Sequence, residues 1–126
     1  MTPLICLAAV LYFEARSEPP DAQAAVAGVV LERVESERWP NTICEVALQP
    51  RQFSAFNNGI PQPKNSVAWE ASLSLASAIL DDPDGTVPLS GATHYHTAKV
   101  RPYWARHYKF LGRHGAHLFY GAPDGL

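Results

Sequence analysis

A single glutamate is the first residue of this chain that could do chemistry. Glu14 follows Tyr12 and Phe13 at the end of an apolar segment, where loss of hydration penalises the carboxylate and favours the protonated carboxyl group. If the segment is a helix, the negative end of its dipole disfavours the charged form further. A protonated carboxyl group is what a general acid for glycoside cleavage requires. Most glutamates at helix ends are solvated, so position alone makes Glu14 only a candidate.

A second carboxylate would be needed for a glycosidase that activates water or forms a covalent intermediate. Glu18 and Asp21 are the nearest candidates. Two prolines separate them and interrupt the helix, so Glu14 and Glu18 need not share a face. The simpler role for Glu18 is an ion pair with Arg16 or Arg51.

Two histidines one residue apart form the other candidate group. On a strand, His94 and His96 would point to the same side, and with a carboxylate they could hold zinc. The sequence has no H-E-x-x-H helix and no cysteine cluster, which favours a structural or substrate-contacting role over a metal site. Four aromatic side chains nearby could form a floor for sugar rings or fill the core: Tyr95, Tyr103, Trp104 and Tyr108.

Helix-breaking and helix-capping residues, together with apolar periodicity, predict the helices and strands that position these residues. We expect helices from Thr2-Pro3 to about 15, over about 20–37, over about 42–48, and over about 67–80 with Ser66 as cap. Residues 50–65 read as a long loop with room for a short strand at Phe53. Two or three short strands are expected near 93–97 and 117–120, joined by a short helical or irregular piece around 102–110. The sum is an α+β domain in which helices dominate.

Composition supports one globular domain. The chain has 126 residues, of which 47% are hydrophobic and 17% charged, a composition that favours a folded domain over a disordered chain. The net charge of −2 disfavours nucleic acid as a partner. Residues 1–92 carry 5 Lys/Arg against 11 Asp/Glu, whereas residues 93–126 carry 5 against 1. This asymmetry fits either a mixed surface or a basic face that meets an anionic polymer.

Six blocks of sequence, in chain order, resemble the SleB-like cell-wall hydrolases, a family named for spore-cortex-lytic enzymes. The blocks are LAAVLYFEARSEP (7–19), QAAVAGVVLERV (23–34), WPNTICEV (39–46), QFS (52–54), GATHYH (91–96, followed by Val100, Pro102, Trp104 and Ala105) and GAHLFY (115–120). Each block alone is a weak signal, but six in order across nearly the whole chain are specific.

The resemblance implies a lysozyme-like catalytic domain that cuts the bond between N-acetylmuramic acid and N-acetylglucosamine. The family's invariant glutamate matches Glu14. It would protonate the leaving glycosidic oxygen, and the 6-hydroxyl of the muramic acid would close on C1 to give a 1,6-anhydro product. Because Glu14 could then accept the hydroxyl proton, one carboxyl group suffices. The resemblance implies no metal and no cofactor.

The resemblance also suggests groove or supporting roles for a further set of residues: Glu18, Gln52, Ser54, His94, Tyr95 and His96. Tyr95 is the best candidate for a non-acidic group near the scissile bond. Relatives have cysteines where this chain has Cys6 and Cys44, but whether these two pair depends on the redox compartment. Many relatives have Gly and Asn at the positions of Ala22 and Glu32, which look tolerable on the second helix.

The expected protein is a monomeric catalytic domain over residues 1–126, and the lack of a second module favours a freestanding lysin such as an endolysin. The apolar run 4–13 has no cationic start and is too short to span a bilayer. We therefore expect action on peptidoglycan in the periplasm or wall, with export by another route or a trimmed leader. Two alternatives stay open: a metal-dependent peptidoglycan amidase or peptidase using His94 and His96, and a non-catalytic wall-binding module.

Overall fold

The apolar N-terminal segment forms the central helix of the molecule. In the computed structural model, which describes residues 1–49, 53, 56 and 58–123, helix α1 spans Pro3–Ala15. The Thr2 side chain accepts a hydrogen bond of 3.2 Å from the Ile5 backbone N–H, which caps the helix start. Every residue from Cys6 to Tyr12 is buried, because α1 is covered by other helices on several sides. α1 therefore has no polar face until its last turn, where Glu14 lies.

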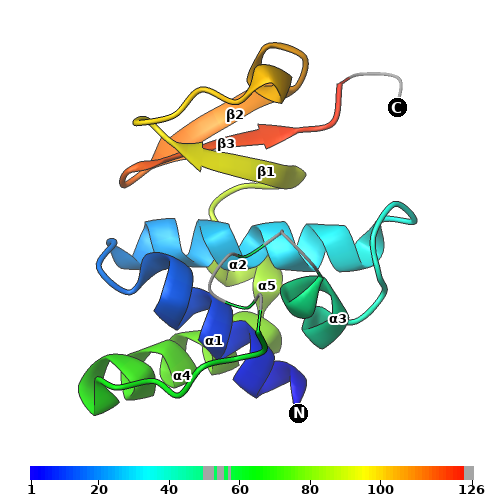
Figure 1. The fold of residues 1–126 in the computed structure, drawn as a ribbon. Helices are drawn as coiled ribbons and strands as arrows, with labels where there is room; N and C mark the ends of the chain where they lie inside the picture. The colour runs from blue at the N-terminus through cyan, green and yellow to red at the C-terminus, as the bar shows by residue number, and fades with distance from the viewer. Residues whose placement is uncertain (50–52, 54–55, 57, 124–126) are drawn as a thin grey trace.

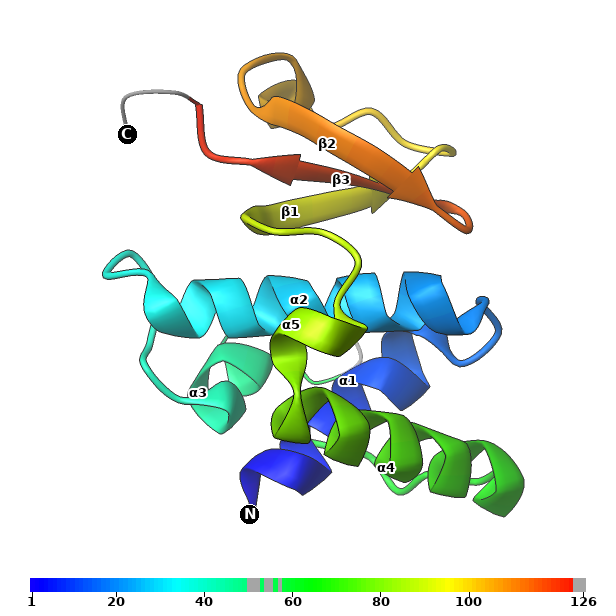
Figure 2. The same cartoon turned by 180° about the vertical axis from the view of Figure 1, so that it is seen from behind.

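Helix α2 separates the sheet from the other helices. It spans Pro20–Glu35 and buries a run of small and β-branched residues from Ala22 to Val30. The sheet lies on one side of α2, and α1, α3 and α4 lie on the other (Figures 1 and 2). Small residues such as Gly28 let neighbouring segments approach α2 closely. The result is one hydrophobic core in which α2 contacts both the sheet and the helical layer.

Three further helices complete the helical layer. α3 spans Ile43–Leu48, α4 spans Ser66–Asp81, and α5 is one turn over Pro83–Thr86. The expected cap Ser66 is the first residue of α4 itself. The cap is Asn65, whose side-chain oxygen accepts from the Ala68 N–H at 3.0 Å. Asp82 follows α4 and is the N-cap of α5, so the segment that ends one helix also starts the next.

The C-terminal part forms a three-stranded antiparallel sheet in the order β1-β3-β2. β1 spans Ala92–Thr97, the 3-10 helix η2 spans Tyr103–Arg106, β2 spans Lys109–His114 and β3 spans His117–Gly121. β1 and β3 were predicted, but β2 was not. β2 is an edge strand with several exposed residues, so pairing with β3 rather than an apolar pattern specifies it. The predicted α+β fold with dominant helices and a small C-terminal sheet is confirmed.

A disulfide and buried phenylalanine side chains tie further parts of the chain to this core. Cys6 of α1 and Cys44 of α3 form a disulfide across 38 residues of sequence. Phe53 is buried in the core and lies in no strand, so the option of a strand there is wrong. Phe56 packs edge-on against Phe13, with ring centroids 5.8 Å apart. Across the described residues, no helix is long and apolar enough to cross a membrane.

Candidate active site

Glu14 lies where the last turn of α1 meets the sheet. Its side chain is partly buried, and burial raises the pKa of its carboxyl group above the ordinary value for glutamate. A hydrogen bond from Tyr95 acts in the opposite direction, because it stabilises the carboxylate. Burial is the larger effect. Glu14 is thus a carboxyl group that holds its proton to a higher pH than a solvated glutamate does.

Tyr95 reaches Glu14 from the middle of β1. Its hydroxyl donates to Glu14 Oε1 at 3.2 Å, and its backbone pairs with Phe119 of β3. Burial, together with the nearby Glu14 charge, raises the pKa of the phenol well above its usual value of 10. The hydroxyl therefore remains a donor throughout the physiological range. This places Tyr95 beside the candidate acid, and its contact with substrate stays a prediction.

Glu18 and Asp21 do not lie free beside Glu14 but hold the turn between β2 and β3. Glu18 Oε1 accepts a hydrogen bond of 2.6 Å from the Ala116 N–H and lies 3.3 Å from His117 Nδ1. Asp21 Oδ2 lies 2.7 Å from His114 Nδ1, and this hydrogen bond lowers the pKa of Asp21. Glu18 thus joins the α1–α2 turn, and Asp21 the first turn of α2, to the turn between β2 and β3.

The predicted pairing of Glu18 with Arg16 is wrong. Arg16 Nη1 instead donates to the Tyr12 carbonyl oxygen at 3.0 Å, and its guanidinium lies over the Tyr12 ring. The physical reason is that the Glu18 carboxylate instead accepts a hydrogen bond from the Ala116 backbone N–H in the turn between β2 and β3. The alternative partner Arg51 lies outside the described residues.

His94 and His96 share one side of β1, as predicted, but this side is opposite to that of Tyr95. The His94 ring packs against Trp39, Trp104 and Tyr108. Burial and two nearby arginines lower the pKa of His94 to about 4, so its ring is neutral at physiological pH. His94 Nδ1 contacts the Thr93 hydroxyl at 2.9 Å.

His96 is engaged through both ring nitrogens. Nε2 contacts the Tyr120 hydroxyl at 2.9 Å, and Nδ1 contacts the Thr97 carbonyl oxygen at 2.7 Å. Among the residues that the structure describes, no three His, Cys, Asp or Glu side chains gather as metal ligands would. The geometry of these histidines is that of an aromatic cluster, and a substrate contact for them stays a prediction.

Two residues that the sequence did not single out help to build the site. Arg33 of α2 is buried, and its Nε donates to the Thr93 carbonyl oxygen at 2.9 Å, which joins α2 to β1 beside Tyr95. His117 starts β3 and packs edge-on against the Tyr95 ring. Both lie in blocks that carried the family resemblance, which was the available signal. The predicted groove residues Gln52 and Ser54 lie outside the described residues.

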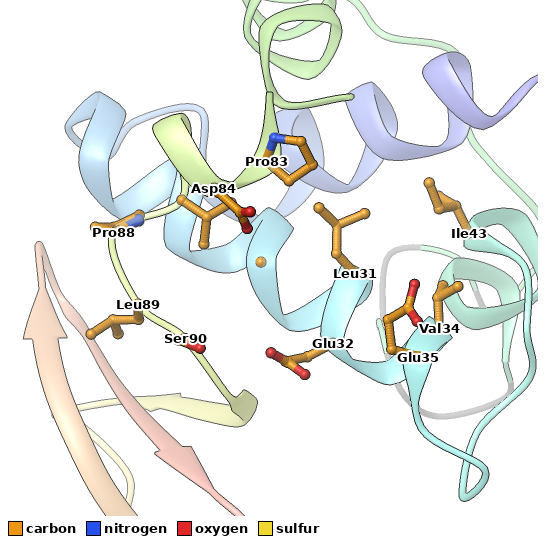
Figure 3. Close-up of a pocket in the computed structure, with 12 residues that line it drawn as sticks. Leu31, Glu32, Val34, Glu35, Ile43, Pro83, Asp84, Pro88, Leu89 and Ser90 are labelled. Carbon is orange, nitrogen blue, oxygen red and sulfur yellow. The ribbon is translucent and has the colours of Figure 1, made fainter. Parts of the chain in front are cut away.

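A cavity of about 590 Å³ lies elsewhere, between α2, α5 and the segment that leads into β1. Its lining includes Leu31, Glu32 and Glu35 of α2 together with Asp84 and Leu89 (Figure 3). Glu14 and Tyr95 do not line it, so its volume gives no evidence about the candidate acid. Glu32 also accepts a hydrogen bond of 2.9 Å from the Gly91 N–H, a role an asparagine could share.

The fold and the site together define a small α+β domain with a partly buried carboxyl acid at a helix–sheet junction. The chain belongs to the Cell Wall Hydrolase family, whose model matches residues 17–120. This confirms the family resemblance. The matched stretch begins after Glu14, so the match does not test the role of that residue.

The relatives are spore cortex-lytic enzymes. The chain is 36% identical over 113 residues to the one from Bacillus cereus and 35% identical over 117 residues to the one from Bacillus subtilis. These alignments cover 86% and 90% of this chain but only 41% and 35% of the relatives. The chain therefore corresponds to less than half of each relative.

Solved structures agree over almost the full chain. The fold matches the catalytic domain of the germination-specific lytic transglycosylase SleB from Bacillus anthracis with a TM-score of 0.73 and 30% identity, covering 94% of this chain and 93% of that one. The catalytic domain of the Bacillus cereus SleB protein gives the same TM-score and identity and is covered to 88%.

Proposed function

We propose that this chain cleaves the glycan strand of peptidoglycan as a lytic transglycosylase, with Glu14 as its acid and then its base. The observation that carries the proposal is the Glu14 carboxyl group, whose pKa burial raises and whose Oε1 accepts a hydrogen bond of 3.2 Å from the Tyr95 hydroxyl. A relative described as a lytic transglycosylase supports the same class of reaction. The substrate would place the site of action in the cell wall.

The reaction needs two proton transfers, one from Glu14 and one back to it. Glu14 donates its proton to the glycosidic oxygen as the bond from that oxygen to C1 of N-acetylmuramic acid breaks. The 6-hydroxyl oxygen of the same sugar bonds to C1, and its proton passes to the Glu14 carboxylate. The products are a 1,6-anhydro end and a free 4-hydroxyl, and the enzyme returns to its starting protonation state. No water enters the balance.

The positions of the other acids favour this route over hydrolysis. A hydrolase needs a second carboxylate to activate water or to attack C1. The two nearest in sequence, Glu18 and Asp21, are engaged by Ala116, His117 and His114 in the turn between β2 and β3. A mechanism in which the sugar's own hydroxyl is the nucleophile does not call on either of them.

Tyr95 would serve the acid in both of its states. When Glu14 is ionised, the phenol donates a hydrogen bond to the carboxylate and stabilises it. When Glu14 is protonated, the same contact fixes the position of the carboxyl group, so that its proton faces the substrate. The Tyr95 phenol keeps its own proton, because burial and the Glu14 charge raise its pKa.

The direct test is the rate at which purified sacculi lose material. Glu14→Gln should reduce release of soluble fragments by about 10²–10⁴-fold, the usual contribution of a general acid. Glu35→Gln, on the exposed face of α2, is the matched control and should keep the wild-type rate. A chelator should leave the rate unchanged. Equal release by wild type and Glu14→Gln would overturn the proposal, and chelator sensitivity would direct attention to a metal-dependent amidase.

A further inference from the structure

His117 packs directly behind the tyrosine that holds the candidate acid. It is the first residue of β3, and its side chain is 8% exposed. The ring centroids of His117 and Tyr95 are 5.2 Å apart with an interplanar angle of 79°, an edge-on contact. Phe119 covers another part of the Tyr95 ring at 5.7 Å. The orientation of the phenol is therefore set by two rings of β3.

The polar edge of His117 faces a carboxylate. Its Nδ1 is buried and makes no hydrogen bond of good geometry with any described residue, but Glu18 Oε1 lies 3.3 Å away. Burying a polar nitrogen without a good partner costs free energy, so a leucine would serve better if only packing mattered. Burial lowers the pKa of His117, and the nearby Glu18 carboxylate opposes this effect. Because burial is the larger effect, the neutral ring is favoured, with Nδ1 on the side of the carboxylate.

Glu18 is itself held from two sides. Its Oε1 accepts from the Ala116 N–H at 2.6 Å, and its backbone carbonyl oxygen accepts from the Gln23 side chain at 2.8 Å. Gly115 allows this approach, because its φ of +57° is left-handed and a Cβ there would lie 2.7 Å from Glu18 Oε1. The carboxylate behind His117 thus has a defined position.

We propose that His117 and Glu18 form a positioning pair that holds the Tyr95 phenol, and through it the Glu14 carboxyl group, in place for proton transfer. The path of contacts runs from Glu18 through His117 and Tyr95 back to Glu14, only four residues before its start. Glu14 lies at the end of α1 and Glu18 in the turn that follows it, so the contacts start and end at the same part of the helical layer and pass through β3 and β1 between them. Neither member of the pair is given a contact with substrate.

The same turn offers a matched control. His114 also pairs with a carboxylate, Asp21 at 2.7 Å, but its side chain is more exposed and it has no described contact with Tyr95. If His117 served only to fasten the turn to α2, loss of His114 should do comparable damage. If His117 acts through Tyr95, only His117 should affect Glu14.

The test measures the pKa of Glu14 by NMR titration of the carboxyl carbon in the full chain, without substrate. Among the described residues, the charged and titratable groups around His117 and Tyr95 are Glu18 from the α1–α2 turn, Glu14 from α1 and Arg33 from α2. Tyr95→Phe should raise the Glu14 pKa, since the phenol lowers it. His117→Leu should raise it in the same direction, and the double variant should match Tyr95→Phe alone. His114→Leu should match wild type.

Glu18 variants keep the test decisive if His117→Leu does not fold. Glu18→Gln retains an oxygen that can accept from Ala116 and His117, so it should titrate like wild type. Glu18→Leu removes this acceptor and should reproduce the upward shift. The idea is overturned if His117→Leu and Glu18→Leu leave the Glu14 titration unchanged, if the shifts of Tyr95→Phe and His117→Leu add, or if His114→Leu shifts it equally.

The kinetic readout rests on the proposed function, whereas the titration does not. On sacculi, His117→Leu should lower kcat about 10-fold with KM unchanged, because only the position of the acid is affected. A chain that shows the titration coupling but releases no fragments would retain the positioning pair and lose the proposed function. If Glu14→Gln is inactive while His117→Leu keeps the wild-type kcat and the wild-type Glu14 titration, the proposed function is retained and the positioning pair is lost.

Discussion

At the scale of single residues, the chemistry of Glu14 depends on a balance between burial and one hydrogen bond. Burial at the end of an apolar helix raises its pKa, and the Tyr95 phenol partly reverses the shift. The sequence indicated the first effect, because Tyr12 and Phe13 precede Glu14 in an apolar run. The second effect depends on the position of β1 over α1, a contact between residues 81 apart in sequence that periodicity does not predict.

The balance predicts a shift in the pH dependence of activity. If Glu14 acts as an acid, activity falls as pH rises through its pKa. Tyr95→Phe removes a bond that stabilises the carboxylate, so the Glu14 pKa should rise and the alkaline limb should move to higher pH. The maximal rate should drop by about 10–100-fold, the value of a hydrogen bond to a charged group. The measurement is the pH profile of fragment release, and a limb that stays in place or moves down would contradict the prediction.

The raised pKa of Glu14 also predicts how the free energy of unfolding depends on pH. A folded-state pKa above the unfolded value means that the folded chain binds the proton more tightly, so stability is full below the unfolded pKa and falls as pH rises through the folded pKa. Glu14→Gln should therefore raise the free energy of unfolding at pH 7 and leave it unchanged below pH 4. Urea unfolding at the two pH values measures the difference. A variant less stable than wild type at pH 7 would show that the carboxylate stabilises the fold.

At the scale of elements, helices were easier to predict than strands. Caps and prolines defined the starts of α1, α2 and α3, because these signals are local. β2 carries no apolar alternation strong enough to predict a strand, and it forms because β3 offers it a partner. The short helix α5 was missed for the related reason that Asp82 and Pro83 both end one helix and begin the next.

Packing between α2 and the segment after α5 gives a prediction at this scale. A Cβ on Gly28 would lie 2.5 Å from Val87 Cγ1, well inside contact distance. Gly28→Ala should lower the free energy of unfolding by about 1–3 kcal/mol through overpacking, despite the better helix propensity of alanine. Adding Val87→Ala should recover part of this loss. Denaturant unfolding of both single variants and the double variant tests the coupling, and strictly additive effects would argue against the clash.

At the scale of the whole molecule, the resemblance predicted more than the residue patterns did. The order of six blocks implied the family, and the family match confirms it. The role of Glu18 in fastening the sheet to the helices could not be predicted, because its partners Ala116 and His117 lie about a hundred residues away. The cysteine pairing was left open by the sequence, and the fold places Cys6 and Cys44 together.

The disulfide should contribute to global stability. It closes a loop of 38 residues of sequence separation, so its loss should lower the free energy of unfolding by about 2–4 kcal/mol. Urea unfolding with and without a thiol reductant measures this contribution. The variant Cys6→Ala/Cys44→Ala serves as control, because reductant should not change its midpoint. A wild-type midpoint that is the same in both conditions would contradict the prediction.

The central claim concerns the bond that is broken and the group that breaks it, and the fragments released from purified sacculi report on both. Mass spectrometry should find 1,6-anhydro-muropeptides with the wild-type chain and none with Glu14→Gln. Fragments with ordinary reducing ends would show that water is the nucleophile and would contradict the transglycosylase route. Identical fragments from wild type and Glu14→Gln would contradict the role of Glu14 itself.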